Sequence, residues 1–89
     1  ASGACVATLE GHEGTVRSVA VLEGGRLASA SDDRTIKIWE LASGACVATL
    51  EGHARPVTSL AILEGRRMAS GADDGEVKIW DSALSDVLG

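Results

Sequence analysis

The side chains that could do chemistry in this sequence come in two matched sets. His12 and His53 lie 41 residues apart, and each histidine is followed along the chain by serine and then by an Asp-Asp pair. Serine, histidine and aspartate are together the residue types of nucleophilic hydrolases, in which histidine takes the serine proton and aspartate orients the histidine. Ser29 and Ser70 are therefore the candidate nucleophiles.

Sequence context argues against hydrolase, metal and phosphate chemistry. The Ser-His-Asp set occurs twice, each serine falls inside a strand pattern, and no oxyanion-hole motif accompanies it. Two histidines 41 residues apart, with cysteines on different strands, lack the short ligand spacing of zinc sites. Gly24-Gly25 precedes a strand, whereas a phosphate-binding loop opens a helix. We therefore expect a protein that is not an enzyme and holds no metal and no cofactor.

Charge and cysteine content limit the compartment and the partners. The net charge of −5 opposes nucleic acid and anionic membrane surfaces, so we expect neither as a partner. No apolar run approaches the length of a membrane span, and the start does not resemble a signal peptide. Cys5 and Cys46 are expected to be small buried hydrophobic residues without an intrachain disulfide, which suits a reducing, cytoplasmic location.

The chain is an internal duplication. An offset of 41 aligns residues 1–12 with an identical copy at 42–53, and 26 of 41 positions are identical over the full repeat. A period near 40 residues is typical of propellers and of helical arrays, and the local pattern favours strands. Each copy carries four short β-branched or alternating runs separated by turn residues, which in the first copy are Cys5–Leu9, Val16–Leu22, Arg26–Ala30 and Thr35–Trp39. The sequence predicts an all-β protein with two four-stranded antiparallel units.

These residues resemble the WD-repeat (WD40) family of β-propellers. The resemblance covers residues 1–41 and 42–82 as two repeats and leaves a tail at 83–89. It rests on Gly11-His12 and Gly52-His53, an Asp-Asp turn, and the closing runs at 36–40 and 77–81, Ile-Lys-Ile-Trp-Glu and Val-Lys-Ile-Trp-Asp, twice in register.

The resemblance assigns the polar residues a structural role. In the family a relay of Trp, Ser or Thr, His and Asp pins each blade. Matched position by position, the first relay is His12, Ser29, Asp33 and Trp39, and the second is His53, Ser70, Asp74 and Trp80.

Two blades leave two open faces, so we expect a homo-oligomer. Head-to-tail contacts between identical chains can close into a ring, and Cys5–Leu9 of one chain is expected to complete a neighbour's blade beside Val77–Trp80. Because each chain contributes two blades, a closed ring contains an even number of blades. A tetramer with eight blades turns by about 45° per blade, closer to the about 51° of a seven-bladed ring than the about 60° of a trimer with six.

The family resemblance implies a non-catalytic protein-interaction scaffold. The alternatives are a designed or excised propeller fragment whose property is self-assembly, and a serine hydrolase. Loop positions that differ between the copies are candidates for a face that binds peptide or protein, although tolerated drift on solvated turns explains the same differences. These positions are Glu13, Thr15, Arg17, Arg34, Arg55, Thr58 and Glu76.

Overall fold

Seven antiparallel strands form two sheets in the computed structural model, which describes residues 3–64 and 67–81. The tail expected at 83–89 lies outside these residues. The first sheet has the order β1-β2-β3-β4 and the second the order β5-β6-β7. Their bounds are β1 Val16–Leu22, β2 Arg26–Ser31, β3 Ile36–Glu40, β4 Cys46–Leu50, β5 Val57–Leu63, β6 Arg67–Ala72 and β7 Val77–Trp80. No described residue belongs to a helix that is long and apolar enough to cross a membrane.

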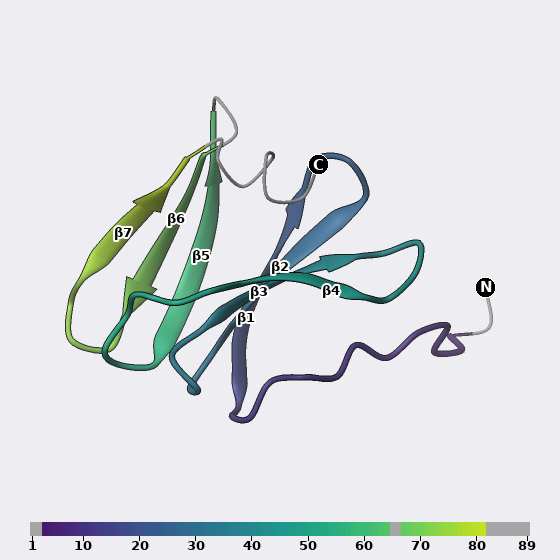
Figure 1. Ribbon diagram of the computed structural model, residues 1–89, viewed down its shortest axis with the longest axis horizontal. Helices are drawn as coiled ribbons and strands as arrows, with labels where there is room; N and C mark the ends of the chain where they lie inside the picture. The colour runs from purple at the N-terminus through teal and green to yellow at the C-terminus, as the bar shows by residue number, and fades with distance from the viewer. Residues whose placement is uncertain (1–2, 65–66, 82–89) are drawn as a thin grey trace.

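The expectation of eight strands is wrong by one within the chain. Cys5–Leu9 forms no strand; the segment extends from the start of β1 without joining either sheet (Figure 1), and the Leu9 side chain lies close to Gly44, between β3 and β4. Its identical copy, Cys46–Leu50, already occupies the edge of β3 as β4. A strand needs a hydrogen-bonded partner along its length, and this segment has none among the residues that the structure describes.

Each sheet has two faces, which the register defines. In the first sheet Ala20, Ala28, Ile38 and Ala48 are successive cross-strand partners, and we call their side face I; Val21, Leu27 and Trp39 lie on the opposite side, face II. The 41-residue repeat gives the second sheet the same two faces. Here Ala61, Ala69 and Ile79 lie on face I, and Ile62, Met68 and Trp80 on face II.

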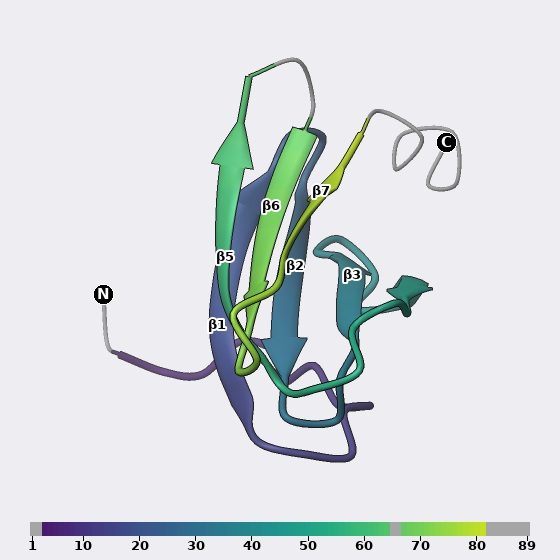
Figure 2. The same cartoon turned by 90° about the vertical axis from the view of Figure 1, so that its left-hand side faces the viewer.

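The two sheets stack head to tail. β5 packs against β1 and β2, as the two views in Figures 1 and 2 show. Face II of the second sheet thereby covers face I of the first. The buried cluster at this contact consists of Ala28, Ala30, Ile36 and Ile38 from the first sheet with Val57 and Met68 from the second. Each of these side chains is 0% exposed, so apolar burial holds the sheets together.

The stacking leaves one face of each sheet open. On face II of the first sheet Val19 and Val21 are 58% and 72% exposed, and on face I of the second Val77 and Ile79 are 66% and 57% exposed. Residue types that pack the interior therefore form two apolar patches, one at each end of the stack. Such patches in a water-soluble protein usually mark interaction surfaces.

Candidate functional site

The first set of polar side chains is connected by hydrogen bonds. Trp39 Nε1 donates to Ser29 Oγ at 2.8 Å, His12 Nε2 lies 2.6 Å from the same oxygen, and His12 Nδ1 lies 2.9 Å from Asp33 Oδ2. Because the indole can only donate, the chain is complete when the Ser29 hydroxyl donates to His12 Nε2 and His12 Nδ1–H donates to Asp33. The relay ties the loop before β1 to β2, β3 and the turn between them.

This arrangement is unsuited to nucleophilic catalysis. Ser29 is 4% exposed and its oxygen already accepts the Trp39 N–H, while the indole lies edge-on to His12 with ring centroids 6.2 Å apart. A carbonyl substrate needs open space beside the nucleophile, and here that space is filled by the indole. The hydrogen bonds of the Ser-His-Asp set thus join the loop before β1 to the first sheet.

Asp33 is the anchor of the first relay. Its Oδ2 accepts from His12 and from the backbone amide of Glu13, and its Oδ1 accepts from the Thr35 hydroxyl at 2.6 Å and the Thr35 amide at 3.0 Å. Burial alone would raise the pKa of Asp33, but the hydrogen bonds from Thr35, His12 and Glu13 outweigh burial and hold that pKa well below its ordinary value of 3.8. The folded chain thus stabilises the ionised carboxylate.

The second set is connected only in part. Trp80 Nε1 donates to Ser70 Oγ at 2.8 Å and His53 Nε2 lies 2.7 Å from that oxygen. His53 Nδ1, on a side chain that is 1% exposed, has no hydrogen-bond partner among the described residues. It lies 3.5 Å from Glu76 Oε1, too far to count as a hydrogen bond. Asp74, predicted to complete this relay, accepts from the Glu76 amide and makes no hydrogen bond to His53.

One substitution between the copies accounts for this difference. Thr35, which holds Asp33 in place through its hydroxyl, is replaced at the equivalent position by Glu76. Thr35 is absent from the predicted relay. The signal that could have revealed it is its place two residues after an aspartate, where a hydroxyl and an amide can both reach the carboxylate in an Asx-type turn.

The cysteines are not buried, contrary to the sequence-based expectation. Cys5 and Cys46 are both exposed and free. Cys46 stands at the start of the outermost strand, at a register shift opposite Trp39, and its thiol donates to the Ala48 carbonyl at 3.4 Å. An edge strand has no further strand to cover its outer end, which leaves the sulfur in solvent.

The candidate binding-face positions lie at one end of the blades, and most make contacts within the chain. The Arg17 guanidinium forms a two-point ion pair with Asp32 at 2.8 and 2.7 Å, and this hydrogen bond raises the pKa of Arg17 and lowers that of Asp32. Arg55 lies 3.4 Å from Asp73. The Thr58 hydroxyl donates to the Gly71 carbonyl, and the Thr15 carbonyl accepts from the Asp32 amide. The Glu13 amide donates to the Asp33 carboxylate. The Glu76 carboxylate lies near His53 and Lys78.

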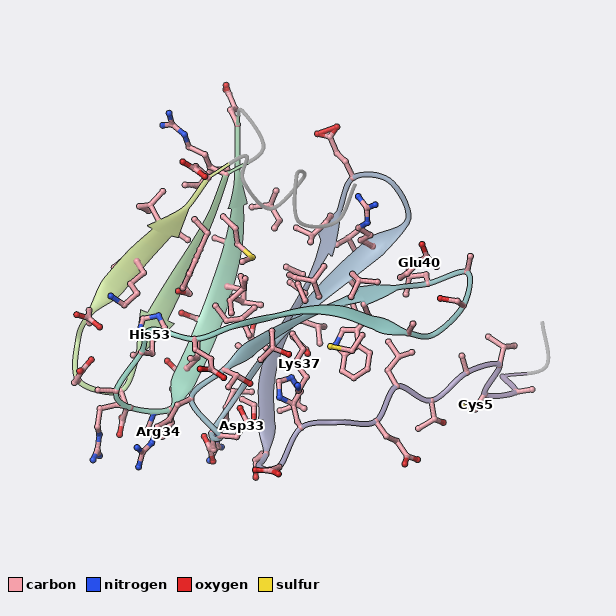
Figure 3. The ribbon with its side chains drawn as sticks, viewed as in Figure 1. Cys5, Asp33, Arg34, Lys37, Glu40 and His53 are labelled. Carbon is pink, nitrogen blue, oxygen red and sulfur yellow. The ribbon has the colours of Figure 1, made fainter. Side chains whose placement is uncertain are left out.

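Arg34 stands apart from the other candidates. It has φ of 76°, and it is the one non-glycine residue with positive φ among those described. The second copy has Gly75 there, with φ of 87°, and a glycine adopts this conformation without strain. The Arg34 side chain is exposed at the loop end (Figure 3) and makes no hydrogen bond or ion pair within residues 3–64 and 67–81. In the same residues, no group of three or more His, Cys, Asp or Glu could hold a metal.

The repeated relay and the stacked sheets agree with a known family model. The model described as WD domain, G-beta repeat matches residues 3–40 and again residues 44–81. The chain belongs to the WD-repeat family. Members of this family are generally non-catalytic scaffolds for protein–protein contacts.

Relatives among curated proteins match over one repeat. The vegetative incompatibility protein HET-E-1 of Podospora anserina is 60% identical over 40 residues, which cover 44% of this chain and 3% of that protein. The nuclear distribution protein nudF 2 of Aspergillus clavatus is 46% identical over 43 residues, which cover 47% of this chain and 10% of that protein. The match thus spans only a small part of each relative.

Designed propeller proteins share the fold at higher coverage. The crystal structure of the computationally designed Ika4 protein superposes with a TM-score of 0.76 and 33% identity over 89% of this chain and 48% of that one. The computationally designed Ika8 protein gives a TM-score of 0.73 and 34% identity over 83% of this chain and 23% of that one. The two sheets of this chain are therefore two WD-repeat blades, with four strands in the first and three in the second among the described residues.

Proposed function

We propose that the 89-residue chain assembles head to tail with copies of itself into a closed WD-repeat propeller, which serves as a non-catalytic scaffold for binding peptide or protein. The observation that carries the proposal is that the two open faces are equivalent, by the repeat, to the two faces that pack together inside the chain. Face II of the first blade and face I of the second are open, and the same two kinds of face are packed together inside the chain. The internal contact is a template for the external one.

The repeat pairs the open residues with buried counterparts. Val57 is 0% exposed inside the chain, whereas its equivalent Val16 is 47% exposed; Ile38 is 0% exposed, whereas Ile79 is 57% exposed. Stacking a second chain on the first would bury Val16 and Ile79 in the way that Val57 and Ile38 are buried inside the chain. Such a contact is heterologous, so it closes into a ring when the rotation per chain divides a full turn.

The same neighbour can supply the missing fourth strand. β4 pairs with β3 with Leu50 opposite Ile36 and Ala48 opposite Ile38, and then leads directly into the next blade. Transferred by the repeat, this register places Leu9 of the neighbour opposite Val77 and Ala7 opposite Ile79. The segment leads into the neighbour's first blade, which is the blade that stacks on the second blade here. Strand addition and face stacking thus require one neighbour in one orientation.

A ring of four chains with eight blades is the assembly we favour, with three chains and six blades next. In a longer chain bearing further repeats, the same two contacts would join consecutive repeats. The two thiols are exposed and unpaired, which fits the reducing, cytoplasmic location that we propose for the assembly.

Charge placed on an open face tests the assembly. In a dilution series followed by native mass spectrometry, we expect the unaltered chain to give four times the chain mass of 9.1 kDa. Val16→Glu places a carboxylate at a position whose counterpart Val57 is 0% exposed, so stacking would bury the charge and the oligomer should be abolished. Leu41→Glu is the matched control, because Leu41 is 48% exposed in the turn after β3, outside both faces. A monomeric unaltered chain, or an oligomer that survives Val16→Glu, would contradict the proposal.

The binding role is proposed for the loop end, where the exposed Arg34 side chain has no carboxylate partner among the described residues. A partner segment with a carboxylate side chain is its complement. We expect an array of acidic peptides to yield a ligand whose affinity falls at least tenfold on Arg34→Glu, with Arg17→Lys as the control for charge already held by Asp32. Equal binding by the Arg34→Glu chain would show that this residue is not the contact.

A further inference from the structure

The contact between the two blades inside the chain and its counterpart between chains are built from equivalent positions. We call the first the internal seam, which comprises Leu22, Ala28, Ala30, Ile36 and Ile38 against Val57, Leu60 and Met68. Subtracting or adding the 41-residue repeat gives the external seam, Leu63, Ala69, Gly71, Val77 and Ile79 of one chain against Val16, Val19 and Leu27 of the next. The existence of the external seam rests on the proposed function.

The external seam carries smaller side chains wherever the two seams differ in size. Gly71 stands for Ala30, Val77 for Ile36 and Val19 for Leu60, and each replacement lacks one carbon. Leu27 and Met68 have the same number of side-chain heavy atoms. At the edge of the external seam, Val21 is the equivalent of Ile62 and is also one carbon smaller. Within the eight residues named for each seam, all the size differences have the same sign, so they add to one another.

We propose that the assembly is built of alternating strong and weak seams, and that it opens at the external seam into whole chains with the internal seam intact. A buried CH₂ group contributes about 0.8 kcal/mol, and about 1.4 kcal/mol corresponds to a tenfold change in an equilibrium constant. The three carbons missing from the external seam, one of them at the partly buried position of Leu60, therefore correspond to an external contact at most about 50-fold weaker than a copy of the internal one.

Two of the missing carbons can be restored without disturbing the single chain. Val19 and Val77 are 58% and 66% exposed, so longer side chains there meet only solvent before assembly. Gly71 is different, because a Cβ at this position would lie 2.9 Å from Ser59 Oγ, and the serine would have to move. The test therefore uses Val19→Leu and Val77→Ile together, which reproduce the residues of the internal seam.

Sedimentation velocity across a dilution series measures the effect on the full 89-residue chain. The double variant Val19→Leu/Val77→Ile is expected to dissociate at a concentration about tenfold lower per seam than the unaltered chain, and the released species should be the single folded chain. The reciprocal control is Leu60→Val/Ile36→Val, which removes the same carbons from the internal seam. It should lower the urea midpoint of unfolding and leave the dissociation concentration unchanged.

The outcomes separate this inference from the proposed function. An unaltered chain that is monomeric at every concentration overturns both. An unaltered chain that assembles, combined with an unchanged or higher dissociation concentration for Val19→Leu/Val77→Ile, overturns the weak external seam and leaves self-assembly standing. The weak external seam is overturned in the same way if the reciprocal control loosens the oligomer as much as the internal fold.

Discussion

At the scale of single residues, the two copies show how a relay depends on the side chain that holds its last member. Asp33 and Asp74 are equivalent in sequence, yet only Asp33 contacts its histidine. Thr35 donates to Asp33, and no such hydroxyl is present where Glu76 stands. The relay therefore depends on five positions, and losing the fifth leaves a buried imidazole nitrogen without a hydrogen bond.

The stability of the fold should depend on the charge of Asp33. Because the folded pKa lies below the ordinary value of 3.8, the unfolded chain binds a proton first as the pH falls, and the stabilisation present above about pH 4 is lost toward the lower folded pKa. Asp33→Asn should cost roughly 1.5–3 kcal/mol at pH 7, and this deficit should shrink below about pH 4. Urea unfolding at a series of pH values measures both.

The matched control is Asp74→Asn, at the position where no hydrogen bond to histidine is formed. It should cost less at pH 7 than Asp33→Asn. The relay does not stabilise the fold if the two variants lose the same free energy of unfolding. The same conclusion follows if the loss for Asp33→Asn does not change between pH 7 and pH 3.

The second relay should be repairable. Glu76→Thr supplies the hydroxyl that Thr35 supplies in the first copy, so that Asp74 can be drawn toward His53 Nδ1, which now lacks a hydrogen bond. Satisfying a buried donor is worth about 1–3 kcal/mol. We expect a higher urea midpoint with an unchanged m-value, whereas Thr35→Glu in the first copy should lower the midpoint. A stabilising effect of both substitutions would refute the assignment.

At the scale of strands, sequence pattern predicted those elements whose partners lie in the same chain. β1 begins and ends as predicted, β2 ends one residue later than predicted, and β3 begins and ends one residue later than predicted. Cys5–Leu9 was predicted by the same pattern, and it forms no strand because a strand also requires an edge that its sequence cannot supply. Cys46 was misplaced for a related reason, since burial depends on what lies beyond the edge of the sheet. Asp74 was wrongly predicted to contact His53, because the aspartate is the same in both copies but the neighbouring Thr35 is replaced by Glu76.

Strand addition predicts that assembly depends on backbone amides in Cys5–Leu9. The double substitution Ala7→Pro/Thr8→Pro removes two adjacent N–H groups, which point to opposite sides of an extended chain, so one of them must face β7 in the assembly. Both residues are exposed in the single chain, so folding of the two blades should persist while the oligomer is lost. Size-exclusion chromatography with circular dichroism measures both properties.

The matched control is Ala7→Ser/Thr8→Ser, which keeps the amides. It should assemble like the unaltered chain. A proline variant that forms the same oligomer as the control would refute strand addition, and the Val16→Glu variant then tests the stacking contact separately.

At the scale of the whole molecule, a ring is possible because the two ends of the chain present different faces. Each chain presents one open face I and one open face II, so two copies cannot satisfy one another through the same patch as in a two-fold dimer. Subunit number reports the angle between blades. A tetramer corresponds to about 45° per blade and a trimer to about 60°.

The identity of residues 1–12 and 42–53 has a kinetic consequence. The edge of β3 cannot distinguish its own β4 from Cys5–Leu9 of another molecule, because the two segments have the same sequence. Only the short covalent connection favours the chain's own strand, and a short linker acts as an effective concentration in the millimolar range. Folding in dilute solution therefore favours β4 at the edge of β3, whereas folding at high protein concentration allows Cys5–Leu9 of another molecule to take the place of β4 and to join the two molecules.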